Sequence, residues 1–403
     1  MEFSSHRRSP DPDSPVTPSE SLTADELARY ARQIRLPAVG IEGQQRLRDA
    51  SVLIVGVGGL GSPAAMYLAA AGVGRIGIAD GDRVDASNLH RQLLHRTGDI
   101  GAPKARSAQA SIGEINPFVR VDAIGRRVSR DNALDLVTAH DVVIDGTDNF
   151  PTRYLLNDAC VLAGRPLIYG SVDRFEGQVA VFATNGGPCY RCLFPEPPEA
   201  GSVQNCAEAG VLGVLPGLIG MLQATEALKV ILGLGDPLTH RLLLVDTLSM
   251  RFRMVDVERD PSCPACGTRE ITELIDYDAF CGAEASRPAG ATPAIASSPG
   301  ELTPAELARA LEAREPLRLI DVREPYEWQI CRIPTAELIP LGTLLVAPPD
   351  VATDQRIVVY CHHGSRSEMA AHALVRAGFK DVRNLVGGID RWSREVDPGV
   401  RRY

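Results

Sequence analysis

The sequence lacks an excess of positive charge. Its 403 residues include 42 Lys plus Arg against 51 Asp plus Glu, which gives a formal net charge of −9. Nucleic acids and anionic membranes are bound through basic protein surfaces. We therefore expect neither nucleic acid nor a membrane to be the main partner.

Long apolar runs and a disulfide pattern are also missing. We judge the apolar runs too short for the ~18 to 20 residues of a membrane span, and we expect no spanning helix. Residues 1–21 carry two arginines without an apolar run behind them, which excludes a secretory signal. The nine cysteines are an odd number, so we expect reduced thiols in the cytoplasm rather than disulfides.

Composition divides the chain into four parts. Residues 1–21 are rich in Ser, Pro and charge and are predicted to be a disordered tail. Residues 22–281 alternate strand and helix patterns. Residues 282–300 are mostly Ala, Pro, Ser and Gly and are predicted to be a flexible linker. Residues 301–403 are predicted to form a second, smaller α/β domain, in keeping with the two or three domains that the length suggests.

The large part is predicted to be a Rossmann-like nucleotide-binding domain with a mainly parallel sheet. Residues 51–80 follow the order strand, glycine-rich turn, alanine-rich helix and strand, which is a βαβ unit. The alternation continues through helix 107–116, strand 119–125, helix 131–139, strand 141–148 and a buried helix over 216–233. Before this unit, Thr23 and Glu26 predict a capping box at the start of a helix over 26–34.

A glycine-rich loop follows the first strand. Gly56, Gly58 and Gly61 fit G-x-G-x-x-G, with Gly59 between them, and Asp80 ends the next strand 19 positions after Gly61. Such glycines let the backbone approach a phosphate at a helix N-terminus, and the Asp can bind ribose hydroxyls. The alternative is a helix–sheet junction that only needs glycine. The motif predicts a nucleotide site and leaves NAD, FAD and ATP open.

Cations and a carboxylate lie near this loop. The segment 87–91 ends in Arg91, and Lys104 follows it, where a simple dehydrogenase fold has helix and strand. A triphosphate needs more neutralisation than a dinucleotide. Asp148 and Asn149 follow a predicted strand at the edge where such sheets bind ligands, and Asp148 could hold Mg²⁺. Each charge alone would be a solvated loop residue, but the set favours a phosphate site.

Two C-x-x-C pairs predict a metal site. Cys189 and Cys192 form one pair, and Cys263 and Cys266 form the other, 71 positions further on. Four thiolates match a closed, tetrahedral and therefore structural zinc site. Redox-active pairs are disfavoured because neither pair is expected to start a helix. An iron–sulfur cluster is a further alternative.

Two other cysteines are candidate nucleophiles. Cys206 lies in a Pro- and Gly-rich crossover, where it is either an unreactive thiol or attacks an activated acyl group. Cys361 ends a strand, and the loop that follows it leads into a helix at Arg366; the helix end and Arg366 are expected to stabilise a thiolate. Four residues separate the two, a tighter loop than in phosphatases, which favours a persulfide over a phosphocysteine. His362 and His363 are expected to be exposed.

These motifs resemble those of two families. GVGGLG with Asp80, SNLHRQ, GAPK, GTDN and the paired C-x-x-C are similar to the MoeB/ThiF family, bacterial relatives of ubiquitin-activating enzymes. DVREPYE (321–327), CHHGSR (361–366) and the segment 387–392 resemble a rhodanese domain. The order of the two resembles sulfur-carrier activators of the MoeZ and MOCS type, and the resemblance covers about residue 22 to the C-terminus.

The resemblance implies a two-stage reaction. Mg-ATP adenylates the C-terminal Gly-Gly carboxylate of a ubiquitin-like sulfur-carrier protein. A persulfide on Cys361, loaded from a sulfane-sulfur donor such as thiosulfate or a cysteine desulfurase, then yields the carrier thiocarboxylate. Such carriers serve molybdenum cofactor (molybdopterin), thiamine, cysteine or other sulfur-product synthesis.

The resemblance also implies roles for single residues. Arg32 matches a position that reaches into the partner subunit's site, which implies a homodimer, and Cys206 matches a crossover-loop cysteine. The implied adenylate site comprises Gly58, Gly59, Gly61, Asp80, Ser87, Asn88, Leu89, His90, Arg91, Lys104, Asp148 and Asn149.

One segment departs from the rhodanese pattern. Such domains usually have Gly-His-Ile-Pro-Gly-Ala where this chain has Cys331-Arg332-Ile333-Pro334-Thr335-Ala336. The loss of both glycines and the His is expected to alter a turn. Cys331 is expected to pack.

Two other functions stay open at this point. An NAD-linked oxidoreductase with a rhodanese appendage would use the glycine loop, but the chain has no evident second substrate domain. A non-enzymatic docking scaffold would not need Arg91, Lys104 and Asp148, which are all present.

Overall fold

Two separate β-sheets organise the chain. The computed structural model describes residues 21–198, 210–282, 299–347, 349 and 351–402. The chain divides into two compact units, Met1–Glu284 and Ala285–Tyr403, and each is described by itself. The predicted tail, all but its last residue, and most of the predicted linker lie outside the described residues.

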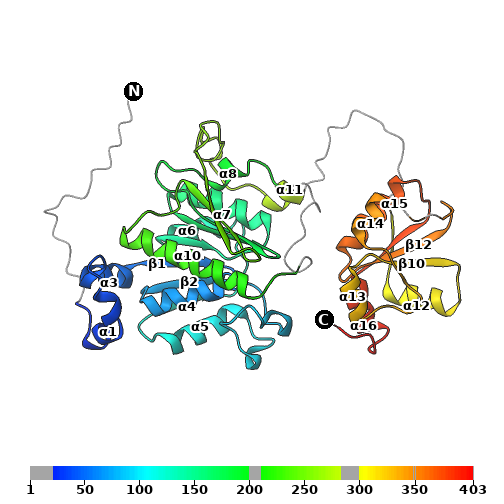
Figure 1. The fold of residues 1–403 in the computed structure, drawn as a ribbon, viewed down its shortest axis with the longest axis horizontal. Coiled ribbons are helices and arrows are strands. Elements are labelled where there is room, and N and C mark those ends of the chain that lie inside the picture. Colours follow the sequence, from blue (N-terminus) through cyan, green and yellow to red (C-terminus); the bar gives the residue numbers. More distant parts are fainter. Residues whose placement is uncertain (1–20, 199–209, 283–298, 348, 350, 403) are drawn as a thin grey trace. The chain divides into compact units, whose positions relative to one another are not determined.

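The first unit, which carries the labels α1 to α11 in Figure 1, is built on an eight-stranded sheet in the order β3-β2-β1-β4-β5-β6-β7-β8. The strands are β1 (Ser51–Val55), β2 (Arg75–Ala79), β3 (Arg120–Ile124), β4 (Val142–Asp145), β5 (Leu167–Asp173), β6 (Glu176–Phe182), β7 (Arg241–Asp246) and β8 (Arg251–Asp256). Strands β3, β2, β1, β4 and β5 are parallel, as the alternating pattern predicts, while β6, β7 and β8 continue antiparallel.

Helices cover both faces of this sheet, and each face has its own core. Residues of α4 (Gly61–Ala71), α5 (Lys104–Ile115) and α10 (Val214–Leu232) pack in one apolar cluster. Residues of α6 (Ala133–Thr138), α7 (Phe150–Ala163) and α11 (Tyr277–Gly282) pack in the other. Parallel strands buried on both faces need such apolar runs, and β1 and β4 have them.

The N-terminal helices differ in detail from the prediction. The capping box forms, with Thr23 Oγ1 accepting from the Glu26 N–H at 3.2 Å. The predicted single helix is interrupted at Tyr30, which separates α1 (Ala24–Arg29) from α2 (Ala31–Ile34), and α3 (Gly40–Asp49) follows. The buried Tyr30 side chain accepts a hydrogen bond from Asn116 Nδ2 at 2.7 Å, which holds this interruption of the helix against the core.

The expectation that no apolar stretch could span a membrane is wrong for α10. By length and composition, this 19-residue helix is apolar enough to do so. In the structure it packs against the sheet, with Leu215, Ile219 and Ala227 buried in the core. It ends, as predicted, at Gly233, which adopts a left-handed conformation (φ 66°).

The second unit contains a parallel five-stranded sheet in the order β11-β10-β12-β13-β9. Its strands are β9 (Gly300–Leu302), β10 (Leu317–Asp321), β11 (Glu337–Leu338), β12 (Arg356–Tyr360) and β13 (Val382–Leu385). Its helices are α12 (Pro304–Glu312), α13 (Pro325–Ile330), α14 (Leu341–Val346), α15 (Ser365–Arg376) and α16 (Gly388–Glu395). Apolar clusters on both sides of the sheet form the core.

Candidate active sites and metal centre

The glycine loop connects β1 to α4 in a shape that only glycine permits. Gly56 has φ 82°, in the left-handed region. A Cβ on Gly61 would lie 2.0 Å from the carbonyl oxygen of Gly56. The loop therefore places backbone N–H groups at the start of an eleven-residue helix, a geometry suited to a phosphate.

Asp80 holds this loop in place. Its Oδ2 accepts the Val57 N–H at 2.9 Å, and its Oδ1 accepts the Asp82 N–H at 2.8 Å. The side chain lies at the carboxyl end of β2. An ionised carboxylate has about four acceptor positions, so contact with a ribose hydroxyl, as predicted, would be a second use of the same oxygens.

A cavity of about 700 Å³ lies against the loop. Seven of the predicted residues line it: Gly58, Gly59, Asp80, Arg91, Lys104, Asp148 and Asn149. Six others do not: Arg32, Gly61, Ser87, Asn88, Leu89 and His90. The structure thus gathers the core of the predicted nucleotide site and leaves a surrounding set outside the cavity wall.

Part of that surrounding set positions Arg91. Asn88 Oδ1 accepts from Arg91 Nη2 at 2.9 Å, and the Ser87 carbonyl accepts from Nη1 at 3.3 Å. The short helix η1 (Ala86–Asn88), capped by Asp85, fixes both acceptors. Segment 87–90 therefore acts on the cavity through the guanidinium of Arg91.

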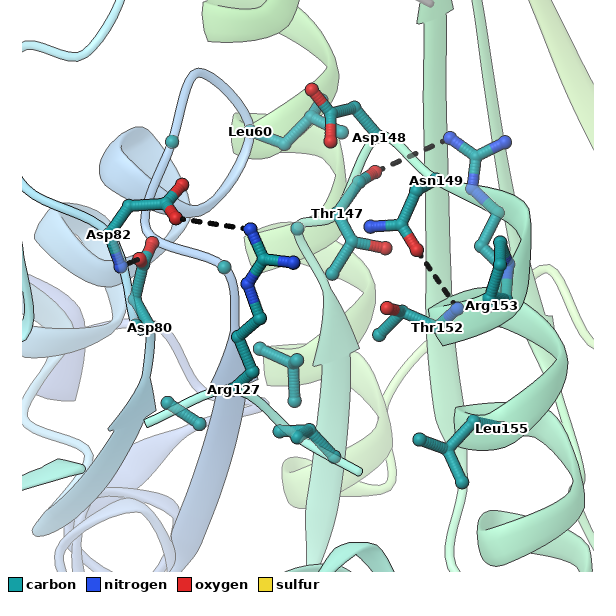
Figure 2. A pocket seen from close by; sticks show the side chains of 18 of the residues that line it. Leu60, Asp80, Asp82, Arg127, Thr147, Asp148, Asn149, Thr152, Arg153 and Leu155 are labelled. Atoms are coloured by element: carbon teal, nitrogen blue, oxygen red, sulfur yellow. Dashed lines mark hydrogen bonds and ion pairs between the residues drawn. The ribbon is translucent and has the colours of Figure 1, made fainter. Parts of the chain in front are cut away.

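Asp82 is a cavity residue that sequence reasoning missed. Its carboxylate forms ion pairs with Lys104 Nζ at 3.2 Å and with Arg127 at 3.6 Å, the latter visible in Figure 2. Arg127 was also missed, although it follows β3 at the same edge of the sheet. The signal for Asp82 was its place two residues after Asp80.

The segment after β4 presents a carboxylate to the cavity. Asp148 is exposed at its edge, while Asn149 caps α7 by accepting the Thr152 N–H at 3.0 Å (Figure 2). Arg153, which also lines the cavity, donates to the Thr147 carbonyl at 3.3 Å. Burial raises the pKa of Asp145 at the end of β4, against the opposing charge of Arg153.

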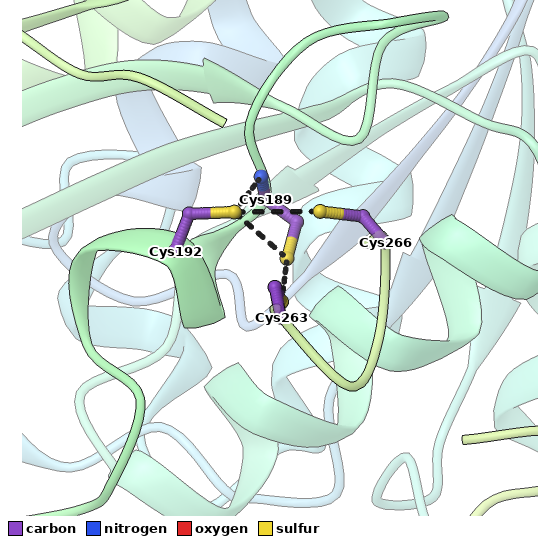
Figure 3. Close-up of side chains that lie close together, drawn as sticks. All are labelled: Cys189, Cys192, Cys263 and Cys266. Atoms are coloured by element: carbon purple, nitrogen blue, oxygen red, sulfur yellow. Dashed lines mark hydrogen bonds between the residues drawn. The ribbon is translucent and has the colours of Figure 1, made fainter. Parts of the chain in front are cut away.

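The four predicted metal ligands converge (Figure 3). The sulfur–sulfur distances are 3.6 Å for Cys189–Cys263, 3.9 Å for Cys189–Cys192 and 3.3 Å for Cys192–Cys266, and all four sulfurs lie within 4.8 Å of one another. Zinc–sulfur bonds of about 2.3 Å in a tetrahedron give sulfur–sulfur edges of about 3.8 Å. The donor set and spacing therefore fit zinc.

The first cysteine pair has two local features, a short helix and a thiol with a lowered pKa. Cys189 caps the short helix α8 (Tyr190–Leu193), so one pair does start a helix, contrary to expectation. A metal centre is therefore distinguished from a redox-active C-x-x-C pair by the convergence of all four sulfurs and not by the absence of a helix. The Cys189 thiol and backbone N–H groups lower the pKa of Cys192 to about 5, and a thiolate is the form that binds metal.

A buried charge cluster attaches the first cysteine pair to the core. Arg191, between Cys189 and Cys192, donates twice to Asp158 at 2.8 Å. Tyr277 at the start of α11 donates to the same carboxylate at 2.7 Å. The metal centre is thereby fixed to α7 and α11.

The second reactive centre is Cys361, at the end of β12. Its Sγ accepts the Gly364 N–H at 3.1 Å and lies 3.5 Å from Ser367 Oγ. The thiol is buried. Gly364 has φ 111°, and a Cβ on Gly388 would lie 2.4 Å from the Cys361 carbonyl oxygen, so glycines close the loop around the sulfur. This is the predicted thiol cradle at the N-terminus of α15.

The residues around this cradle differ from expectation. Arg366, which was expected to stabilise the thiolate, makes a bidentate ion pair with the buried Glu327, at 2.6 and 2.8 Å. His362 and His363 stack with ring centroids 4.1 Å apart, and only His363 is exposed as expected. Burial and then the charge of His363 lower the pKa of His362 to about 4.

Three predicted residues lie apart from these sites. Cys206 lies outside the described residues. Arg32 is exposed on α2, away from the cavity wall of its own chain. Cys331 packs, as expected, against the apolar cluster of the second unit, and its carbonyl accepts from Arg323 at 2.8 Å.

These features define an α/β nucleotide-binding enzyme with a four-cysteine centre and a second, thiol-bearing domain. The chain belongs to the ThiF family, whose model matches residues 30–265, and a rhodanese-like domain matches residues 303–395. The predicted family and fold class are confirmed.

Relatives share both parts of the chain. The probable adenylyltransferase/sulfurtransferase MoeZ of Mycobacterium tuberculosis is 46% identical over 395 residues, covering 96% of this chain and 98% of its own. The adenylyltransferase and sulfurtransferase MOCS3 of Sus scrofa is 45% identical over 415 residues, covering 97% and 91%.

Solved structures agree in fold. E. coli MccB with MccA-N7isoASN has a TM-score of 0.54 at 22% identity, over 60% of this chain and 74% of that one. E. coli MccB with ATP has a TM-score of 0.53 at 22% identity, over 59% and 74%.

Proposed function

We propose that the chain adenylates the C-terminal Gly-Gly carboxylate of a ubiquitin-like sulfur-carrier protein and then converts it to a thiocarboxylate with sulfur from Cys361. The observation that carries this proposal is the presence, in one chain, of a cavity lined by a glycine loop together with Arg91, Lys104 and Asp148, and of a separate thiol cradle. The names of the relatives, adenylyltransferase and sulfurtransferase, fit the same two activities.

The first stage needs charge compensation. A carboxylate is a poor acyl donor until its oxygen becomes part of a leaving group, which AMP provides. The carboxylate attacks the α-phosphate of ATP, and pyrophosphate leaves. Attack of one anion on another requires flanking cations, and Arg91 and Lys104 line the cavity for this role. Asp148 would hold Mg²⁺, whose charge offsets that of the phosphate oxygens.

The second stage uses the thiol cradle. A persulfide on Cys361 attacks the acyl carbonyl, and AMP leaves, which gives an acyl disulfide. A second thiol then attacks the Cys361 sulfur, so that the carrier thiocarboxylate leaves and a disulfide remains. Cys206 is the proposed second thiol, and a cellular thiol reductant would restore both cysteines. Zinc, held by the four cysteines, would have a structural role.

The assembly proposed for this reaction is a homodimer in the cytoplasm. Arg32 is exposed and does not line the cavity of its own chain, so we assign it to the cavity of the partner subunit. The adenylating domain is proposed to span 22–281 and the sulfurtransferase domain 301–403, with 282–300 as a flexible linker between them.

An apolar stripe on β8 is proposed to dock the carrier. Strand β8 is the edge of the first sheet and pairs only with β7 among the described strands. Phe252 and Met254 alternate along it, Met250 directly precedes it, and each of the three is at least half exposed. Exposed apolar edges of this kind are typical of protein interfaces.

ATP–pyrophosphate exchange tests the first stage. Exchange by the purified chain should depend on a Gly-Gly-ended carrier from the same genome, and Asp148→Ala should abolish it. No exchange with any such carrier, while the protein still binds nucleotide, would return the glycine loop to the oxidoreductase or scaffold alternatives.

The Cys361→Ala variant tests the second stage. Pyrophosphate exchange should stay at the wild-type rate, because the adenylate cavity is in the other unit. Thiocarboxylate formation, followed by mass spectrometry of the carrier, should be lost. A normal thiocarboxylate yield without another sulfur source would remove the second unit from the mechanism.

A further inference from the structure

The cation at the end of the sulfur loop has its charge compensated. Arg366 lies in the first turn of α15, five positions after Cys361. Both of its terminal nitrogens donate to Glu327 of α13, at 2.6 and 2.8 Å, and the two side chains are only 5% and 4% exposed. Glu327 also accepts the Glu324 N–H at 2.9 Å, which fixes its position.

The other charges around the loop are also paired. Arg323 donates to Asp321 at 2.9 Å, and both side chains are fully buried. His362 is neutral near pH 7 because its pKa lies near 4. Asp390 of α16, whose N–H donates to the His362 carbonyl at 3.1 Å, is paired with the exposed side chains of Arg402 at 3.1 Å and Arg394 at 2.5 Å. Among the described residues, the two buried arginines of the cradle, Arg323 and Arg366, are therefore each compensated by a buried carboxylate.

A cradle of this kind discriminates between sulfur donors by charge. Thiosulfate carries two negative charges next to the transferable sulfur, and its binding needs cations that are not already paired. A persulfide on a cysteine carries at most one. Backbone N–H groups and the N-terminus of α15 together offset about half a charge, which suits the monoanion.

We propose that Glu327 is a specificity-determining residue of the sulfurtransferase site. By holding Arg366, it makes the cradle accept sulfur from a cysteine persulfide and disfavour the dianion thiosulfate. This inference rests on the proposed function of Cys361. In the favoured reaction, the Cys361 thiolate attacks the terminal sulfur of R–S–SH and the sulfur–sulfur bond breaks. R–S⁻ leaves with the electron pair, and Cys361 becomes the persulfide without any external oxidant.

The charge of Glu327 can be removed while its shape is kept. In Glu327→Gln, one acceptor oxygen remains for the cap of α13, and Arg366 contributes an uncompensated positive charge. Loading of Cys361 is measured by mass spectrometry of the full-length chain, with thiosulfate or with a cysteine desulfurase supplied with L-cysteine. We expect the ratio of kcat/KM for thiosulfate to that for the persulfide to rise by roughly tenfold or more, from one added charge near the dianion.

Matched variants distinguish the loss of the Glu327 charge from a disruption of the fold. Glu327→Asp keeps the negative charge and should keep the wild-type ratio. Glu337→Gln removes an exposed carboxylate of β11 that pairs with Arg318 of β10, and it should also leave the ratio unchanged. If Glu327→Gln does not fold, the wild-type chain still tests the proposal, because it should load faster from the persulfide than from thiosulfate.

The outcomes distinguish this proposal from the function that it assumes. A folded Glu327→Gln with the wild-type ratio, or a wild-type chain that prefers thiosulfate, overturns the role of Glu327. Failure of Cys361 to take up sulfur from either donor overturns the sulfurtransferase proposal itself.

Discussion

At the scale of single residues, Thr335 is in a strained backbone conformation. It lies in the turn Ile333–Ala336 with φ 71°, where Ala336 N–H donates to the Ile333 carbonyl at 3.3 Å. Pro334 precedes it, and a turn with Pro followed by a residue of positive φ favours glycine at that following residue, the position of Thr335. A β-branched residue there costs about 1–3 kcal/mol. The departure from the rhodanese pattern thus leaves the turn in place under strain.

Replacing Thr335 by Gly should therefore stabilise the second unit by about 1 kcal/mol, after the greater chain entropy of glycine is counted. Denaturant unfolding of the chain, followed through Trp328 and Trp392 of this unit, measures the change. Thr335→Ala keeps the Cβ and should recover less. Equal stability of the Gly variant and the wild type would show that the turn relaxes without cost.

His362 should make the stability of the second unit depend on pH. In the unfolded chain its pKa is about 6.5, whereas burial lowers the pKa to about 4 in the folded unit. Between these values the unfolded state binds more protons, so the free energy of unfolding falls as the pH decreases from about 6.5 to about 4. His362→Gln should flatten this part of the pH profile, and an unchanged slope would contradict the assignment.

The residues that could be predicted from sequence are those with local motifs. The glycine loop, Asp80 and the cysteine pairs are defined by spacing within short segments, and the structure gathers them. The pairing of Glu327 with Arg366 and of Asp82 with Lys104 could not be predicted, because the partners are 39 and 22 positions apart. Such pairs depend on how helices pack, which periodicity does not encode.

At the scale of elements, the edge strand β8 gives a test of carrier docking. Phe252→Asp places a charge in the exposed stripe and should raise the carrier concentration for half-maximal pyrophosphate exchange by about tenfold or more. The rate at saturating carrier should change little, since β8 contributes no residue to the cavity wall.

The control is Leu345→Asp, because Leu345 is an equally exposed apolar residue of the second unit. This variant should leave exchange unchanged. A Phe252→Asp chain with normal carrier dependence would exclude β8 as the docking surface.

Elements with strong patterns were predicted, and those that depend on pairing were not. Helix α10 and strands β1 to β4 were expected from the alternating strand and helix patterns. Strands β5 to β8 were not, and β8 is exposed along its whole length, so it has no buried face to mark it. Its place is set by backbone pairing with β7 from Arg251 to Asp256.

At the scale of the whole molecule, the cysteine centre should control the stability of one unit alone. Cys263→Ser, or removal of zinc by a chelator, should lower the Tm of the first unit, because the four buried or half-buried cysteines would then lose the metal ion that links them. The Tm of the second unit should stay the same.

Calorimetry of the full chain measures both transitions, and the bound metal is counted by elemental analysis. The Cys331→Ser variant is the control, since Cys331 lies in the second unit. A first transition that does not respond to metal removal would contradict a structural role for the centre.

The distance along the chain between the two cysteine pairs has a consequence for biosynthesis. The first pair follows β6, whereas Cys263 and Cys266 follow β8, the last strand of the first sheet. The complete ligand set therefore exists only after the ribosome has passed Cys266, when every strand of the first sheet has been made and none of the second. Metal uptake during translation would accordingly coincide with completion of the adenylating unit and precede the appearance of the sulfurtransferase thiol.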